Sequence, residues 1–369
     1  LGLFFIFLYT ITPFVGFLLR NDMNISLIDS VSPSLRFIQC VTYGFFALYI
    51  GLNEFSIRGS VNKWLKQVVV TVLLSITVHT IYAFYQYAAF FGLLSYGDLP
   101  HLKFYEGRES WFYWWRATGL LANPNTFGIL SFFCSVSTLL LLLWKEIQGY
   151  GCWLLYLLSV IGVILSGSRT AIVSLVLISV ICIFIGSMHK KIININIKGP
   201  AFLTFVALPI VIIIINSSDK LRIRFAEIIN LLGNWDKIEN LTGRFNFWDH
   251  AIHLLRTDTQ FIGTLVSPYR IYESISTDNG YVALLLQFPL LSLLFTLWMI
   301  GGLIFSLLQF KLNPLGTTFF AITILSLFIV NMTLNLMIEF VLLIVFFVLN
   351  GVALSSILFR KNSIERTIY

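Results

Sequence analysis

The strongest constraint in this sequence is a series of apolar runs, each long enough to cross a lipid bilayer as a helix. Two of them extend from Val68 to Leu94 and from Tyr281 to Leu308, and a spanning helix needs roughly 20 residues. Backbone polar groups in lipid must be paired within the protein, which leaves only helices or a closed barrel. Barrel strands would show short alternating patterns, whereas these runs are continuous. The sequence therefore predicts an all-α, polytopic integral membrane helix bundle.

About ten spans fit this pattern. They are predicted near residues 1–19, 35–52, 68–94, 119–144, 150–167, 171–188, 201–215, 281–310, 318–333 and 338–359, and Pro289 could break the eighth. The chain is 58% hydrophobic and 11% charged, whereas soluble domains carry about 25% charged residues. Its net charge is +7, and the basic residues are spread over the connections without a dense cluster. We therefore expect the chain to interact with the lipid bilayer and not with nucleic acid.

The short basic connections all fall on one side of the predicted bundle, which the positive-inside rule makes cytoplasmic. They hold Arg58, Lys63, Lys66, Lys145, Lys190, Lys191, Lys198, Lys311, Arg360, Lys361 and Arg366. The other side receives residues 95–117, the tight turn at 166–170 and the long connection 216–279. We therefore expect one membrane domain over residues 1–369 with a large periplasmic or extracellular loop at 216–279. The chain begins at Leu1 without a basic leader, so we also expect further sequence upstream.

Two amphipathic helices are predicted within the 216–279 loop. Leu221, Phe225, Ile228, Ile229 and Leu232 recur at helical spacing, and Arg222 lies away from that stripe. Such a helix is typical of a membrane interface. A second helix should start near Arg244 and carry His250 and His253 on its polar face. These two histidines have no third ligand at a diagnostic spacing, so no metal site is predicted.

Two polar patches interrupt the apolar runs in the first half of the chain. In the first, Arg116 follows an aromatic run, and Asn123 and Asn125 flank Pro124 at the start of a span. A capped helix start beside an aromatic interface belt explains much of this patch, but arginine is also a preferred phosphate ligand. In the second, Arg169 lies in the 166–170 turn, where it either snorkels to lipid headgroups or meets an anion.

Two more polar patches lie in the second half. The helix led by Arg244 is one, and Asp278 with Asn279, at the start of the next span, is the other. Asp278 or Thr277 could simply cap the helix of that span, and a catalytic or ligand-binding role is equally open. Inside the spans, Glu339 is placed near the outer end of its helix, and the deeper His79 could be a packed neutral histidine.

All four patches are predicted on the outer side, and three contain an arginine. This arrangement suits a substrate with an anionic head at the interface and a tail in lipid, such as a lipid-linked pyrophosphate. Charge that builds on a departing pyrophosphate is stabilised by cations already in position. No metal or cofactor is needed in principle.

At these same patches the chain resembles the bacterial O-antigen polymerase and O-antigen ligase superfamily. The likeness lies in RATGLLANPNTFG at 116–128, SGSRTAIVSLVL at 166–177, GRFNFWDHAIHLL at 243–255 and DNGYVALLLQFPLLSLL at 278–294, together with the Tyr85-Gln86-Tyr87 sequence late in the third span. The resemblance implies a GT-C-like membrane glycosyltransferase of the bacterial inner membrane, with an active site that faces the periplasm. Its substrate would be an undecaprenyl-pyrophosphate-linked oligosaccharide, and a chain-length-regulating co-polymerase is an expected partner.

A polymerase of this family extends a carrier-linked repeat unit, whereas a ligase transfers the finished glycan to lipid A core. Ligases typically have a His-Asn pair where this chain has Asp278 and Asn279, which favours the polymerase. We expect Arg116, Arg169 and Arg244 to hold the pyrophosphate. Asp278 would orient or deprotonate the acceptor hydroxyl, with His250 as the substitute base and Asn279 as a positioning group. Further substrate contacts are predicted at Asn123, Asn125, Arg222 and Glu339.

A flippase or transporter for the same lipid-linked sugar is the alternative from another class. Transporters place their polar residues near the bilayer midplane, often at broken helices within repeats. Here the polar patches lie at one face, which favours an enzyme. A structural membrane protein would not need Arg169 in a tight turn and ranks third.

Overall fold

The computed structural model of this protein describes residues 2–19, 26–58, 61–94, 116–121, 123–188, 239–257, 262–265, 279–332 and 339–368, with 212, 216, 219, 222, 223 and 226. Every regular element within these residues is an α-helix, which confirms the all-α prediction. Seven of the helices are long and apolar enough to cross a membrane, and two shorter apolar helices accompany them. The protein is therefore a multi-pass membrane protein.

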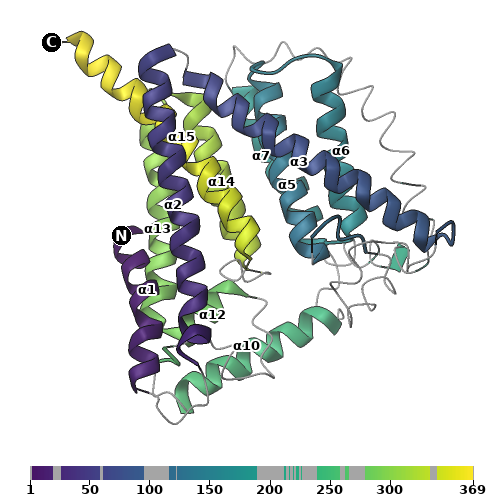
Figure 1. Ribbon diagram of the computed structural model, residues 1–369, viewed down its shortest axis with the longest axis vertical. Coiled ribbons are helices and arrows are strands. Elements are labelled where there is room, and N and C mark those ends of the chain that lie inside the picture. Colours follow the sequence, from purple (N-terminus) through teal and green to yellow (C-terminus); the bar gives the residue numbers. More distant parts are fainter. Residues whose placement is uncertain are drawn as a thin grey trace. The chain divides into compact units, whose positions relative to one another are not determined.

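The helices form two compact units. The first, which we call unit 1, comprises residues Leu1–Gly59 and Asn234–Tyr369. Its helices are α1 (Gly2–Leu19), α2 (Leu27–Arg58), α10 (Glu239–Thr257), α12 (Gly280–Gln287), α13 (Pro289–Gln309), α14 (Pro314–Asn331) and α15 (Phe340–Ile368) (Figure 1). Unit 2 comprises residues Ser60–Gly233 and contains α3 (Val61–Phe90), α5 (Pro124–Leu143), α6 (Tyr150–Ser166) and α7 (Arg169–Met188).

Nine of the ten predicted spans coincide with described helices. The remaining predicted span, at 201–215, lies almost entirely outside the described residues. In the long 216–279 loop, the second predicted helix is observed as α10, and it starts at Glu239 rather than near Arg244. The first predicted loop helix also lies largely outside the described residues.

Unit 2 is built around α5. In the apolar stretch of α5, 100% of the residues are buried, whereas in that of α3 only 28% are. A helix that is apolar on all sides belongs in the interior, and α3, α6 and α7 all pack on it. Small residues allow these close contacts, as membrane helix pairs require. Gly162 of α6, for example, lies against the Ser131 side chain of α5 and the Thr80 side chain of α3.

Unit 1 is held by the long pairing of α15 with α2. Gly351 of α15 lies against the backbone of Gly44 in α2, because neither residue has a side chain to separate the helices. An aromatic cluster joins α1, α2, α13 and α15. Its members are Phe5, Tyr9, Phe37, Phe295, Trp298 and Phe347.

Two helices start at an Asn-Pro pair, and the sequence explains both starts. The Asn123 side chain accepts a hydrogen bond from the Asn125 N–H at 2.8 Å, and Pro124 follows as the first helical residue of α5. Asn313 and Pro314 begin α14 in the same way. An Asn cap pairs an exposed backbone N–H, and proline at the first position has no N–H to leave unpaired. The predicted cap at Asn123 is confirmed.

The predicted span 281–310 is divided into α12 and α13 at the proline that was expected to break it. Phe288 lies between them in an extended conformation, with φ −164° and ψ 116°. Proline disfavours the helical conformation in the residue before it and lacks the N–H that would continue the helix. This division leaves α12 only 8 residues long, so α13 is the segment long enough to span a membrane.

The predicted sidedness can be tested with single cysteines at exposed positions on the two sides. Gln148 lies between α5 and α6, and Asn246 lies on α10 within the 216–279 loop; both are exposed. In a Cys152→Ser background, we expect Asn246→Cys to react with a membrane-impermeant maleimide on intact spheroplasts. Gln148→Cys should react only after permeabilisation, because the positive-inside rule places its connection in the cytoplasm. Labelling of both positions from the same side would contradict the predicted topology.

Candidate functional site

Arg116 is the first described residue of a short irregular stretch, residues 116–121, that packs among the helix ends of unit 2. Its Nε donates a hydrogen bond to the backbone oxygen of Ser166 at 3.1 Å, and its Nη2 donates to Oδ1 of Asn125 at 2.5 Å. The side chain is half-buried. Both of these acceptors are neutral oxygens, and the two bonds orient the guanidinium.

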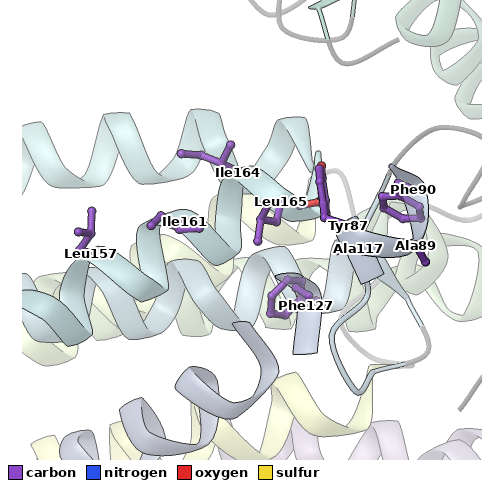
Figure 2. Close-up of a cluster of buried hydrophobic side chains, with 10 residues drawn as sticks. Tyr87, Ala89, Phe90, Ala117, Phe127, Leu157, Ile161, Ile164 and Leu165 are labelled. Carbon is purple, nitrogen blue, oxygen red and sulfur yellow. The ribbon is translucent and has the colours of Figure 1, made fainter. Parts of the chain in front are cut away.

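The next residue, Ala117, fixes the backbone of this segment against α6. Its N–H donates to the Leu165 oxygen at 3.0 Å, and the Tyr87 hydroxyl of α3 donates to the same oxygen at 3.4 Å. Figure 2 shows Tyr87, Ala117 and Leu165 beside one another, with Phe127 of α5 in the same buried cluster. The segment thus lies at a junction of α3, α5 and α6.

The following three backbone N–H groups are paired with side chains of α3. The N–H groups of Thr118 and Gly119 donate to Oε1 of Gln86, each at 3.0 Å. The Leu120 N–H donates to Nδ1 of His79 at 3.1 Å. Gly119 has a φ of 58° and packs against the His79 backbone oxygen, so glycine suits this position on both counts. His79, deep in the span, is thus an acceptor for the backbone.

The turn between α6 and α7 reaches the same junction. Gly167 ends α6 in the left-handed conformation, with a φ of 58° and its N–H on the Ile164 oxygen, as helix C-termini commonly do. A Cβ on Gly167 would lie 3.4 Å from Cγ of Arg116. Arg169, the first residue of α7, follows in this turn and is half-buried. The structure therefore brings the first two polar patches together.

The resulting arrangement, which we call the arginine junction, contains Arg116, Asn125 and the turn 166–169. Two guanidinium groups at one set of helix ends make a positively charged location that suits phosphate oxygens. Asn123 caps α5 beside it through the Asn125 N–H. Of the sequence-predicted site residues, Arg116, Asn123, Asn125 and Arg169 therefore lie at or beside this junction in unit 2, and Arg222 belongs to the same unit.

The fourth patch is found in unit 1 at the start of α12. The Asn279 side chain accepts from the N–H groups of Tyr281 and Val282, at 2.9 and 3.1 Å, so Asn279 caps the helix, whereas the sequence pointed to Asp278 or Thr277 as the possible cap. The buried Asn331, at the end of α14, lies directly against Gly280. The Tyr281 hydroxyl donates to the Phe328 oxygen at 3.2 Å. Asp278 itself lies outside the described residues.

The third patch, on α10, packs beside this motif. Ala251 and Leu255 of α10 bury themselves against Leu286 of α12, while His250 and His253 are exposed. Arg244 lies within α10, and its side chain is outside the described residues. Among the described residues, no group of three or more His, Cys, Asp or Glu side chains could hold a metal ion.

A short piece of the long loop, residues 262–265, completes the end of α12 and was not predicted. The N–H groups of Thr264 and Leu265 donate to the oxygens of Leu286 and Gln287, each at 2.7 Å. The last oxygens of a helix have no partner within it, and Pro289 lacks the N–H that could supply one. The only sequence signal for this contact was the proline itself.

Two further predicted contacts are described. Arg222 is exposed and forms an ion pair with Asp219 at 2.8 Å. Glu339 is half-buried and directly precedes α15, where a negative charge suits the positive end of the helix dipole. The roles of Arg222 and Glu339 as substrate contacts stay predictions.

Residues 154–288 match the family model described as O-antigen ligase. This match supports the resemblance of the chain to the O-antigen ligase and polymerase superfamily. The matched segment covers the α6–α7 turn, α10 and the Asn279 motif, which are three of the four patches on which the resemblance was based. No curated protein and no solved structure matches the chain significantly.

The α6–α7 turn should not tolerate a side chain at Gly128. A Cβ there would collide with Oγ of Ser166 and approach Cβ of Ser168 to 2.8 Å. We expect Gly128→Ala to lower the melting temperature of the purified protein by roughly 2–10 °C, because overpacking costs about 1–3 kcal/mol. Gly151→Ala is the matched control, since a Cβ there has no atom within 4 Å. Equal melting temperatures for the two variants would contradict this packing.

The start of α12 should be equally sensitive at Gly280, where a Cβ would collide with the Asn331 side chain. We expect Gly280→Ala to destabilise the protein by about 1–3 kcal/mol. Gly301→Ala in α13, a site with no atom within 4 Å of its Cβ, should be neutral or stabilising, because alanine favours helices over glycine. Thermal unfolding in detergent measures both. A neutral Gly280→Ala would show that Asn331 does not fix this motif.

Proposed function

We propose that this protein is a polysaccharide polymerase that acts at the outer face of the bacterial inner membrane. In the proposed reaction it transfers a glycan from undecaprenyl pyrophosphate onto a carrier-linked repeat unit. The match to the O-antigen ligase family model supports the general class, a ligase or polymerase type of glycosyltransferase. The donor, the acceptor and the sidedness are part of the proposal.

The observation that carries the proposal is the arginine junction. Arg116 is oriented by a backbone oxygen and by Asn125, and Arg169 lies in the adjoining turn at the start of α7. Both lie at ends of apolar helices, where a lipid-anchored substrate would present its phosphates. Arginine binds phosphate through paired, charge-assisted hydrogen bonds, so this location supports binding of a lipid-linked pyrophosphate.

In the proposed reaction, the bond between the sugar C1 and the pyrophosphate oxygen breaks, and a bond from C1 to the acceptor hydroxyl oxygen forms. The hydroxyl proton passes to Asp278, or to His250 as the substitute base, and undecaprenyl pyrophosphate leaves. Arg116 and Arg169 stabilise the negative charge on the leaving group. The predicted roles of Arg244 as a third phosphate ligand and of Asn279 as a positioning group complete the proposal.

An O-antigen ligase that transfers the glycan to lipid A core is the second candidate, because the matching family model carries that description. The sequence Asp278-Asn279 supports the polymerase, since ligases of the superfamily typically have a His-Asn pair there. A flippase for the same lipid-linked sugar is less well supported, because Arg116 bonds to the end of α6 and Arg169 begins α7, whereas transporters place their polar residues near the bilayer midplane.

Arginine variants test the proposed phosphate site. We expect Arg116→Ala and Arg169→Ala each to reduce polymerisation by about 10²–10³-fold, the usual cost of removing one group that stabilises transition-state charge. The conservative Lys variants should be intermediate, because lysine keeps the charge but not the paired geometry. Polymer ladder length at equal protein level in a complemented deletion strain measures the effect.

Lys311→Ala is the matched control, because Lys311 is an exposed basic residue between α13 and α14 and has no proposed role. Its ladder should match that of the unaltered protein. Full-length ladders from both arginine-to-alanine variants would refute the proposed phosphate site.

The glycan profile of the deletion strain separates the two candidate activities. Loss of a polymerase should leave a single repeat unit on the core. Loss of a ligase should leave bare core, with polymer still attached to the carrier. The second profile would reject the polymerase and favour the ligase.

A further inference from the structure

Gln86 is fully buried near the end of α3, and its carboxamide pairs with both residues of the Thr118-Gly119 peptide. Its Oε1 accepts the N–H groups of Thr118 and Gly119, each at 3.0 Å. Its Nε2 donates to Oγ1 of Thr118 at 3.0 Å and to the Gly119 oxygen at 3.3 Å. One side chain therefore holds two donors and two acceptors of the segment that begins at Arg116.

Only a carboxamide can make this set of bonds, because it carries an acceptor and a two-hydrogen donor on one rigid group. Its orientation is also determined, since two backbone N–H groups converge on the same atom and require an oxygen there. Methionine has a similar length but would leave the N–H groups of Thr118 and Gly119 buried without this acceptor, which is costly. Glutamate would keep the acceptor and lose the amide donor.

These bonds determine where Arg116 can point. Ala117, the neighbour of Arg116, is bonded to the Leu165 oxygen of α6, and the two residues after it are bonded to Gln86 of α3. The backbone on the C-terminal side of Arg116 is thus fixed to two different helices. The Arg116 guanidinium meets the Ser166 oxygen and Asn125 from this fixed base.

A buried glutamine could instead act only as polar glue between helices, as serine and threonine often do in membranes. Thr80, on the same helix, shows what that role looks like, since its Oγ1 donates to the Leu158 oxygen of α6 at 3.3 Å. Gln86 differs in its target. The four bonds above end on an irregular segment and not on a neighbouring helix, and that segment carries the arginine.

We infer that Gln86 is a positioning residue, which acts through the 116–119 segment to hold Arg116 in place for the substrate pyrophosphate. The inference rests on the proposed function, because it assigns to Arg116 the phosphate contact. Gln86 itself does not touch the substrate. Misplacement of a binding group by about 1 Å can cost as much as 10²-fold, so a loss of this size is expected when Gln86 is replaced.

A double-mutant cycle on binding tests the inference in the full-length protein. The probe is undecaprenyl pyrophosphate, titrated against purified protein in nanodiscs, so that variants without turnover can still be measured. We expect Gln86→Met to weaken binding by about 10–100-fold in the unaltered background. In the Arg116→Ala background the same substitution should change the Kd by less than about threefold, because residues that act through one group are not additive.

Thr80→Val is the matched control, and it should leave the Kd unchanged while it removes one buried hydrogen bond of α3. If Gln86→Met does not fold, Gln86→Glu enters the same cycle, because it keeps the acceptor for both N–H groups. An equal loss in both Arg116 backgrounds, or no loss in either, would overturn the positioning role. A failure of the proposed function would give a different result: the Arg116→Ala single variant would bind undecaprenyl pyrophosphate as tightly as the unaltered protein does.

Discussion

In a bilayer, irregular backbone must find its hydrogen-bond partners within the protein, and unit 2 depends on how residues 116–120 meet this demand. The Ala117 N–H is bonded to the Leu165 oxygen of α6, and the next three N–H groups are bonded to Gln86 and His79 of α3. Residues 116–120 precede α5, which begins at Pro124, so they have no helix of their own to pair their N–H groups. The bonds to α3 and α6 supply those partners instead. The same bonds that satisfy the backbone place Arg116 beside the α6–α7 turn.

Unit 1 meets a related demand at Pro289. The proline ends α12 and leaves helix oxygens that residues 264 and 265 of the long loop then pair. At the other end of α12, the Asn279 side chain caps the helix and Gly280 gives room to Asn331. Both units therefore combine an asparagine cap with a glycine at a close approach, and in both this occurs in a segment on which the resemblance to the superfamily was based. These segments thus encode backbone geometry.

The sequence predicted the features that depend on neighbouring residues. Continuous apolar runs gave the helices, Asn123 with Pro124 gave the start of α5, and Pro289 gave the break after α12. It did not predict that Gln86 binds a peptide 32 residues away, or that Gly128 packs on Ser166. These contacts join segments whose local patterns carry no information about each other. A glutamine inside an apolar run was the available signal, because such a residue in lipid needs a partner.

The partners of Arg116 also bear on why an arginine and an asparagine occur together at this junction. A carboxylate partner would hold a guanidinium more strongly, but it would also neutralise the charge that a phosphate requires. A backbone oxygen and a carboxamide oxygen fix the direction of the side chain, and neither carries a charge that would compete with an anion for the guanidinium. These two bonds therefore orient Arg116 without opposing the binding of a phosphate.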